Sequence, residues 1–225
     1  MKKILLVIVE GETDMISLEG VFENIFSNST VEFEIIRGDL QLIAGSDKNI
    51  VQGIRNMVES FMKLYYLQKE NILRIVHIID TDGAFIPAEK VERGSQGHVK
   101  YLSNRILAPN PEQIVRRNAS KTEFVKTLVK TEDIEGIPYG IYYFSRNLEH
   151  VLHNRDDIVQ NRTKCRLAYD FSDRYSRDPE GFLTFIRNES VAVNQGYIGS
   201  WAFIFSRCNS LKRYSNLHVV FEDMS

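Results

Sequence analysis

Two short, continuous runs of apolar and largely β-branched residues most constrain the fold of this chain. One extends from Ile4 to Val9 and the other from Ile75 to Ile79, and acidic residues follow each run directly. Such runs are typical of strands buried on both faces, as in parallel sheets covered by helices. Acidic side chains at the carboxyl ends of these strands would lie where open α/β sheets bind ligands.

Apolar periodicity predicts alternating strands and helices in the first part of the chain. Strands are expected over residues 3–9, 31–36, 73–79 and 139–144. Helices are expected over residues 13–26, with Thr13 as N-cap, and over residues 49–66. This alternation favours parallel strands joined by right-handed crossovers, and hence a Rossmann-like, mostly parallel sheet flanked by helices.

The rest of the chain is less regular and then mainly helical. Residues 83–118 are interpreted as a long loop with a helix near Val99–Leu107, and another helix is expected to begin near Ser120. Helices are expected over residues 148–152, 156–169 and 179–186, and a final strand over 218–221. We therefore expect an α/β domain over residues 1–152, with an insertion at about 84–118, and a largely helical extension over 153–225.

Composition indicates a soluble protein of the cytoplasm. The chain has two cysteines, Cys165 and Cys208, and the start of the sequence lacks the features of a signal peptide. Reduced thiols are therefore expected rather than a disulfide. No apolar stretch is long enough for a membrane span.

Positive charge is concentrated in one segment, although the chain as a whole has a net charge of −2. The segment from Lys90 to Lys130 contains nine basic and three acidic residues. A local basic surface beside acidic residues suits a phosphodiester substrate. Taken alone, the charge run is also compatible with a solvated helix face and a loop.

Carboxylates at the two strand ends predict a divalent cation. Glu10 and Asp14 follow the first strand, and Asp80 and Asp82 follow the third. Clustered carboxylates repel one another unless a cation lies between them, and their hard oxygen ligands suit Mg²⁺ or Mn²⁺. Gly11 permits a sharp turn and the close approach of a phosphate to the start of the next helix.

These motifs resemble the TOPRIM family, the metal-binding domain of topoisomerases, bacterial primases and OLD-type nucleases. The family pattern is a strand that ends in Glu-Gly and a later strand that ends in Asp-x-Asp. Glu10-Gly11 and Asp80-x-Asp82 match it. The sequence from Val9 to Asp14 is most similar to the OLD-type branch.

The resemblance implies a metal-dependent nuclease. It implies that Glu10, Asp80 and Asp82 act in catalysis and bind metal, and that Asp14 and Glu149 support a second metal position. Asn147 stands where OLD-type proteins have an aspartate. Because the chain lacks a phosphate-binding Gly-x-x-x-x-Gly-Lys-Ser/Thr motif, an ATPase would be a separate partner, and the resemblance implies a role in phage defence.

Basic residues of the segment from Lys90 to Lys130 are the candidates for substrate contacts. Lys121 is the candidate that would stabilise developing negative charge. The candidates for binding the nucleic acid strand are Lys100, Arg105, Arg116 and Arg117.

Two other functions remain open at the level of sequence. The same site would serve in a non-catalytic module that binds a nucleic acid or a nucleotide. Asp80-Thr81-Asp82-Gly83 also resembles the nucleophile motif of haloacid-dehalogenase-type phosphatases, although that motif usually ends the first strand of its domain.

Overall fold

A computed structural model describes residues 2–27, 31–45, 49–94, 97–155 and 161–222. The chain forms two compact units, and each is assembled from separate segments. The first unit contains residues 1–78, 124–141 and 168–182, and the second contains 79–123, 142–167 and 183–225. The domain division expected after residue 152 stays a prediction.

The first unit is built on a mixed, mostly parallel sheet with the strand order β2-β1-β3-β8-β7. Its strands are β1 (Lys3–Val9), β2 (Val31–Arg37), β3 (Ile72–Asp80), β7 (Asp133–Ile134) and β8 (Ile137–Phe144). Strand β1 pairs in parallel with both β2 and β3, whereas β7 and β8 are antiparallel. The α/β class and the four main strands are thus as predicted.

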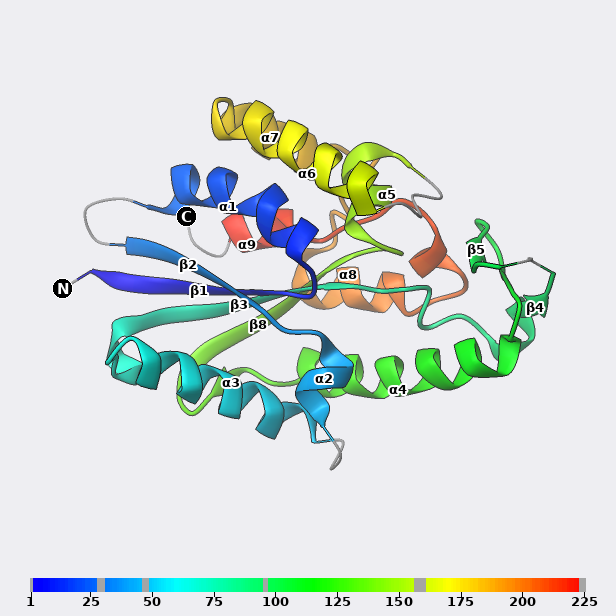
Figure 1. The fold of residues 1–225 in the computed structure, drawn as a ribbon, viewed down its shortest axis with the longest axis horizontal. Helices are drawn as coiled ribbons and strands as arrows, with labels where there is room; N and C mark the ends of the chain where they lie inside the picture. Colours follow the sequence, from blue (N-terminus) through cyan, green and yellow to red (C-terminus); the bar gives the residue numbers. More distant parts are fainter. Residues whose placement is uncertain (1, 28–30, 46–48, 95–96, 156–160, 223–225) are drawn as a thin grey trace. The chain divides into compact units, whose positions relative to one another are not determined.

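Helices cover both faces of this sheet, with α1 (Glu12–Phe26) on one face and α3 (Ile50–Leu64) on the other (Figure 1). On the α1 side, Phe22 contacts the ring of Phe182, and Phe182 also contacts Phe171 and Tyr175. These aromatic residues bury the apolar stripe of α1.

The start of α1 differs from the prediction. Gly11, rather than Thr13, is the N-cap, and the Asp14 carboxylate accepts a hydrogen bond of 2.9 Å from the Gly11 N–H. The N-cap is therefore two residues earlier than expected, and the helix begins at Glu12. The Asp14 carboxylate in the first turn satisfies the Gly11 N–H, which is the contact of a capping box and favours a start at this glycine.

The second unit contains a small sheet with the order β4-β6-β5 and several helices. The strands are β4 (Val91–Arg93), β5 (Lys100–Tyr101) and β6 (Ile106–Ala108). The expected helix near Val99–Leu107 is therefore wrong. Ile106 and Ala108 are buried while Leu107 between them is half-buried, which is the two-residue period of a strand.

Long helices and short helical turns make up most of the remaining described residues. They are α2 (Leu40–Ala44), α4 (Pro111–Val129), α5 (Leu148–His153), α6 (Asn161–Ser176), α7 (Pro179–Arg187), α8 (Gly196–Ile204) and α9 (His218–Glu222), with 3₁₀ turns at Lys69–Asn71, Ala88–Lys90 and Asn209–Leu211. Residues 156–160, where a helix was expected to start, lie outside the described residues.

Two further predictions of secondary structure are wrong. Helix α4 begins at Pro111 rather than near Ser120, since proline suits the first turn of a helix. Residues 218–221 form helix α9 instead of a strand. All four of these residues are buried, and a short buried helix has the same apolar pattern as a buried strand.

Aromatic residues near the C-terminus pack inside the second unit. The Trp201 side chain is 1% exposed, and its ring lies 4.9 Å from that of Tyr143 at the end of β8. Phe205 contacts both Trp201 and Phe85. Trp201 and Phe205 therefore serve to pack the second unit, and the burial of Trp201 leaves little of its ring surface for contact with a ligand.

The junction of α2 and α3 generates a stability prediction. A Cβ added at Gly53 would lie 1.9 Å from the backbone oxygen of Ile43, so Gly53→Ala should force the two helices apart. We expect a loss of about 1–3 kcal/mol in the free energy of unfolding by urea, although alanine ordinarily favours a helix. Ser60→Ala, at an exposed position of α3, is the control, and an equally stable Gly53→Ala protein would contradict the prediction.

Candidate functional site

The ends of β3 and β8 are joined within the second unit by backbone hydrogen bonds. The Thr81 N–H donates to the carbonyl of Phe144 at 2.9 Å, and the Asp82 N–H donates to that of Arg146 at 2.8 Å. In return, the Arg146 N–H donates to Thr81 Oγ1 at 2.8 Å. The two loops that carry candidate residues therefore form one hydrogen-bonded structure.

Several residues in these loops have left-handed backbone conformations. The φ angles are 50° at Asp82, 72° at Gly83, 74° at Phe85 and 62° at Arg146. Aspartate tolerates this region better than most residues, whereas arginine and phenylalanine pay a steric cost. Strained backbone of this kind persists only where surrounding contacts enforce it, and it is concentrated at functional sites.

Asp82 is paired with a buried lysine. Lys121 Nζ lies 2.6 Å from Asp82 Oδ2, and the Lys121 side chain is only 5% exposed, compared with 34% for Asp82. Arg117 Nη2 donates to the backbone carbonyl of Asp82 at 2.6 Å. Helix α4 thus directs two of the predicted basic residues toward one predicted acidic residue.

The surroundings of Asp82 keep its carboxyl ionised. Loss of solvent around the carboxyl by itself raises its pKa, but nearby positive charge outweighs this effect and the pKa is lowered. The contributions come from the charges of Lys121 and Arg117, from the hydrogen bond of Lys121, and from the charge of Lys164.

Glu149 forms a second ion pair at the same site. Its side chain is 4% exposed, and its Oε1 lies 3.0 Å from Lys164 Nζ of helix α6. Because the charge of Lys164 also lowers the pKa of Asp82, this ammonium group acts on both carboxylates. Lys164 thus pairs with Glu149 and makes a smaller electrostatic contribution at Asp82.

Asp80 is held at the start of helix α5. Its Oδ1 accepts a hydrogen bond of 2.9 Å from the Leu148 N–H. Asn147 is the N-cap of the same helix, and its side chain accepts from the His150 N–H at 2.9 Å. Asn147 therefore has a capping role, and Glu149 lies in the first turn of α5.

The other predicted basic residues do not join this cluster in the same way. Lys100 and Arg116 are exposed, and Arg105 Nε lies 3.6 Å from Glu92 Oε2. Arg117 also contacts the Tyr101 hydroxyl at 3.2 Å. Of the four basic substrate-binding candidates, Arg117 thus contacts the Asp82 loop, while the other three lie on the surface of the second unit.

Glu10, Gly11 and Asp14 belong to the first unit. Glu10 is half-buried directly after β1 and lines an open pocket of about 500 Å³, whereas Asp14 is buried and caps α1. Asp80, Asp82 and Glu149 belong to the second unit. The expected convergence of Glu10 with the two aspartates therefore stays a prediction.

Sequence analysis did not identify Lys164 or Arg146 as residues of the site. Arg146 lies 5.3 Å from the centre of the Tyr101 ring in a cation–π contact, and Lys164 pairs with Glu149. Lys164 lies beyond the expected metal-binding domain, and its helix has many charged residues. Lys164 could have been suspected only once Glu149 was known to be buried, because a buried carboxylate needs a cationic partner.

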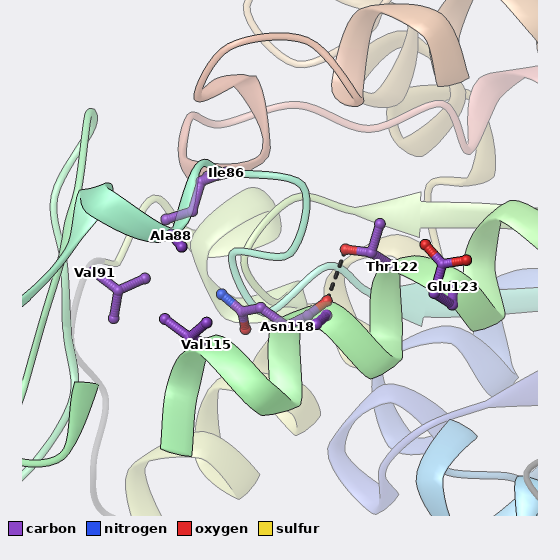
Figure 2. A pocket seen from close by; sticks show the side chains of 8 residues that line it. Ile86, Ala88, Val91, Val115, Asn118, Thr122 and Glu123 are labelled. Atoms are coloured by element: carbon purple, nitrogen blue, oxygen red, sulfur yellow. Dashed lines mark hydrogen bonds between the residues drawn. The ribbon is translucent and has the colours of Figure 1, made fainter. Parts of the chain in front are cut away.

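A smaller cavity of about 260 Å³ lies beside α4 in the second unit (Figure 2). Its lining is mostly apolar and consists of Ile86, Ala88, Val91, Val115, Asn118, Ala119, Thr122 and Glu123. The Thr122 hydroxyl donates to the Asn118 carbonyl at 2.7 Å, and the Asn118 side chain donates to the Gly83 carbonyl at 2.9 Å. None of the predicted site residues lines this cavity. Asn118 lines it and also binds the backbone of Gly83, next to Asp82, so it connects the cavity wall to the Asp82 loop.

A divalent cation such as Mg²⁺ needs several oxygen ligands directed at one point. Within the described part of the chain, no group of three or more His, Cys, Asp or Glu side chains is arranged to hold a metal ion. Asp82 and Glu149 supply carboxylate oxygens, which are the type of ligand that Mg²⁺ and Mn²⁺ prefer, and each of these carboxylates is paired with a lysine.

The lowered pKa of Asp82 predicts a contribution to acid stability. Its folded-state pKa lies below its unfolded value of about 3.9, so this stabilisation is complete above that value and is lost as pH falls through the folded-state pKa. Asp82→Asn should therefore flatten the dependence of unfolding free energy on pH in this acidic range. Asparagine also tolerates the left-handed backbone.

Urea unfolding at a series of pH values between about 2 and 6 measures this effect. Asp133→Asn is the control, because Asp133 is exposed and, like many surface carboxylates, only bonds a nearby backbone N–H. Equal slopes for wild type, Asp82→Asn and Asp133→Asn would contradict the assigned ion pair.

No family model, curated protein sequence or solved structure matches this chain. Among the described residues, no helix is both long enough and apolar enough to cross a membrane. The function must therefore be argued from the charged site itself.

Proposed function

We propose that this protein is a metal-dependent nuclease that hydrolyses phosphodiester bonds in DNA or RNA. The observation that carries the proposal is that Asp82 and Glu149 of the second unit are each paired with a lysine ammonium group, at 2.6 and 3.0 Å, beside loops with left-handed backbone. Two carboxylates that are each paired with a lysine, with Arg117 bound to the backbone of the Asp82 loop, suit the chemistry of a phosphate ester and a metal ion.

Asp80, Asp82 and Glu149 would hold Mg²⁺ or Mn²⁺ in the second unit. When bound, such an ion lowers the pKa of a water molecule and neutralises charge on the phosphate. The resemblance to TOPRIM nucleases adds Glu10 and Asp14 as ligands, and this part of the proposal rests on the resemblance alone. A separate ATPase partner and a role in phage defence rest on the same resemblance.

The basic residues would have two roles in this mechanism. Lys121 and Lys164 form ion pairs with Asp82 and Glu149, respectively, and hold these side chains in place in the folded protein. Together with Arg117, they would also supply positive charge to a phosphodiester as negative charge develops on its oxygens. Lys121 is buried, so its ammonium group has a defined position and is screened less by solvent than the charge of a surface lysine.

One observation favours a second candidate function, a module that binds nucleic acid without cutting it. The lysine pairs balance the charge of Asp82 and Glu149 without any metal ion. Binding of labelled oligonucleotides without cleavage in either Mg²⁺ or Mn²⁺ would support this alternative. Hydrolysis of a phosphate monoester without oligonucleotide cleavage would instead support a phosphatase.

Conservative variants test the nuclease. Asp80→Asn, Asp82→Asn and Glu149→Gln each remove one charge but keep an oxygen that accepts the existing hydrogen bond. Each should lower Mg²⁺-dependent cleavage of single- and double-stranded oligonucleotides by at least about 100-fold, because metal binding and phosphate activation are lost. Cleavage is measured on end-labelled DNA and RNA in gels.

Asp133→Asn is the matched control and should keep full activity, because Asp133 is exposed and lies outside the proposed site. Glu10→Gln in the same assay tests the ligand that comes from the resemblance. Wild-type rates in all three variants of the second unit would refute the proposed site.

Lys164 gives a separate prediction that does not depend on activity. Because its ammonium group competes for the same carboxylates, Lys164→Met should tighten Mn²⁺ binding roughly fivefold, as expected for the loss of about 1 kcal/mol of repulsion. Electron paramagnetic resonance measures free Mn²⁺ during the titration. Lys90→Met, at an exposed position, is the control. Weaker Mn²⁺ binding by Lys164→Met would contradict the inferred competition between the Lys164 ammonium group and the metal ion.

A further inference from the structure

The first unit contains an open pocket of about 500 Å³ beyond the carboxyl ends of β1 and β2. We call it the β2-end pocket. Its lining consists of Glu10, Arg37, Gly38, Asp39, Leu42, Ile43 and Met57. All of these residues belong to the first unit, so the pocket is defined within one compact body.

Close packing of glycines against side chains and backbone forms the floor of this pocket. A Cβ added at Gly38 would lie 2.8 Å from the ends of both the Ile43 and the Met57 side chains. Gly53 lets the backbone of α2 at Ile43 approach α3 directly, and Figure 1 shows the two helices side by side. The short helix α2 is therefore held against α3 as one wall of the pocket.

The walls combine an apolar surface with charged groups. Leu42 is 81% exposed, so its side chain is not used in the core and offers apolar surface beside Ile43 and Met57. Asp39 Oδ1 accepts hydrogen bonds from the N–H groups of Gln41 and Leu42 at 2.8 and 3.1 Å, which fixes this carboxylate at the rim.

Arg37 adds a positive charge to a pocket whose other charged residues, Glu10 and Asp39, are acidic. It is exposed at the end of β2, and no carboxylate within the described residues forms an ion pair with it. The pocket therefore offers an apolar face, carboxylate acceptors from Glu10 and Asp39, and one cation.

We propose that the β2-end pocket binds a nucleobase, together with the phosphate attached to its nucleoside. Its volume falls in the range of small-molecule sites. A flat base would stack on the apolar side chains of Leu42 and Met57, as bases do on apolar and aromatic side chains in other sites. Carboxylates accept hydrogen bonds from exocyclic amino groups, and Arg37 matches the phosphate.

This chemistry predicts a preference among bases. Adenine, cytosine and guanine carry an exocyclic amino group that donates to a carboxylate, whereas uracil has carbonyl oxygens and no exocyclic amino group. In naming the ligand as a nucleotide of the substrate strand, the inference rests on the proposed nuclease function. The pocket itself does not depend on that function.

Isothermal titration of the full chain without divalent cations tests the proposal with adenosine, cytidine, guanosine and uridine 5′-monophosphates, with the nucleosides, and with inorganic phosphate. At least one amino-bearing nucleotide should bind with a dissociation constant in the millimolar range or tighter, and more tightly than the uridine nucleotide or phosphate. Arg37→Gln and Leu42→Asn should each weaken that binding about tenfold.

Matched controls separate the pocket from general effects. Arg177→Gln removes an exposed arginine elsewhere in the first unit, and Leu64→Asn removes another exposed leucine, which is 70% exposed on α3. Both controls should bind like wild type. Thermal melting should confirm that the four variants fold, since each changed side chain is exposed.

The outcomes distinguish this inference from the proposed nuclease. Nucleotide binding that depends on Arg37 and Leu42, without any oligonucleotide cleavage, would retain the pocket and refute the nuclease. Cleavage with no nucleotide binding, or with binding that neither pocket variant weakens, would retain the nuclease and overturn the pocket. Binding of phosphate as tight as that of every nucleotide would also overturn the proposed base contact.

Discussion

The hydrogen bond from the Asp82 N–H to the Arg146 carbonyl, with its two neighbours at Thr81, is the contact on which the charged site depends. It joins the loops after β3 and β8 and imposes left-handed backbone on both Asp82 and Arg146. Without this connection, each loop would relax toward an ordinary turn. The carboxylate of Asp82 would then lose its fixed position beside Lys121.

Charge compensation is the second constraint on the site. Glu149 is almost fully buried, and a buried carboxylate without a partner is strongly unfavourable. Lys164 meets this requirement for Glu149 and also acts on Asp82, while Lys121 pairs with Asp82 directly. A divalent cation and a phosphodiester would therefore take the places of the lysine partners that Asp82 and Glu149 already have.

In the first unit, two glycines allow close packing that any larger residue would prevent. Gly38 and Gly53 allow α2 to lie against α3 and the end of the sheet without steric conflict. This close approach leaves Leu42 outside the core and creates a pocket with both apolar and charged walls. The proposed base site therefore follows from the absence of side chains at Gly38 and Gly53 as much as from the residues that line it.

The sequence alone determined the α/β class, the four main strands and the acidic strand ends, because continuous apolar runs and their polar ends are local features. It did not determine β5 and β6, the start of α4 or helix α9, where short apolar runs fit either a strand or a helix. Tertiary structure alone selected Arg117 from the basic segment and brought Lys164 to Glu149. Such pairs join distant segments, and their geometry depends on how buried backbone and charges are satisfied together rather than on any local pattern.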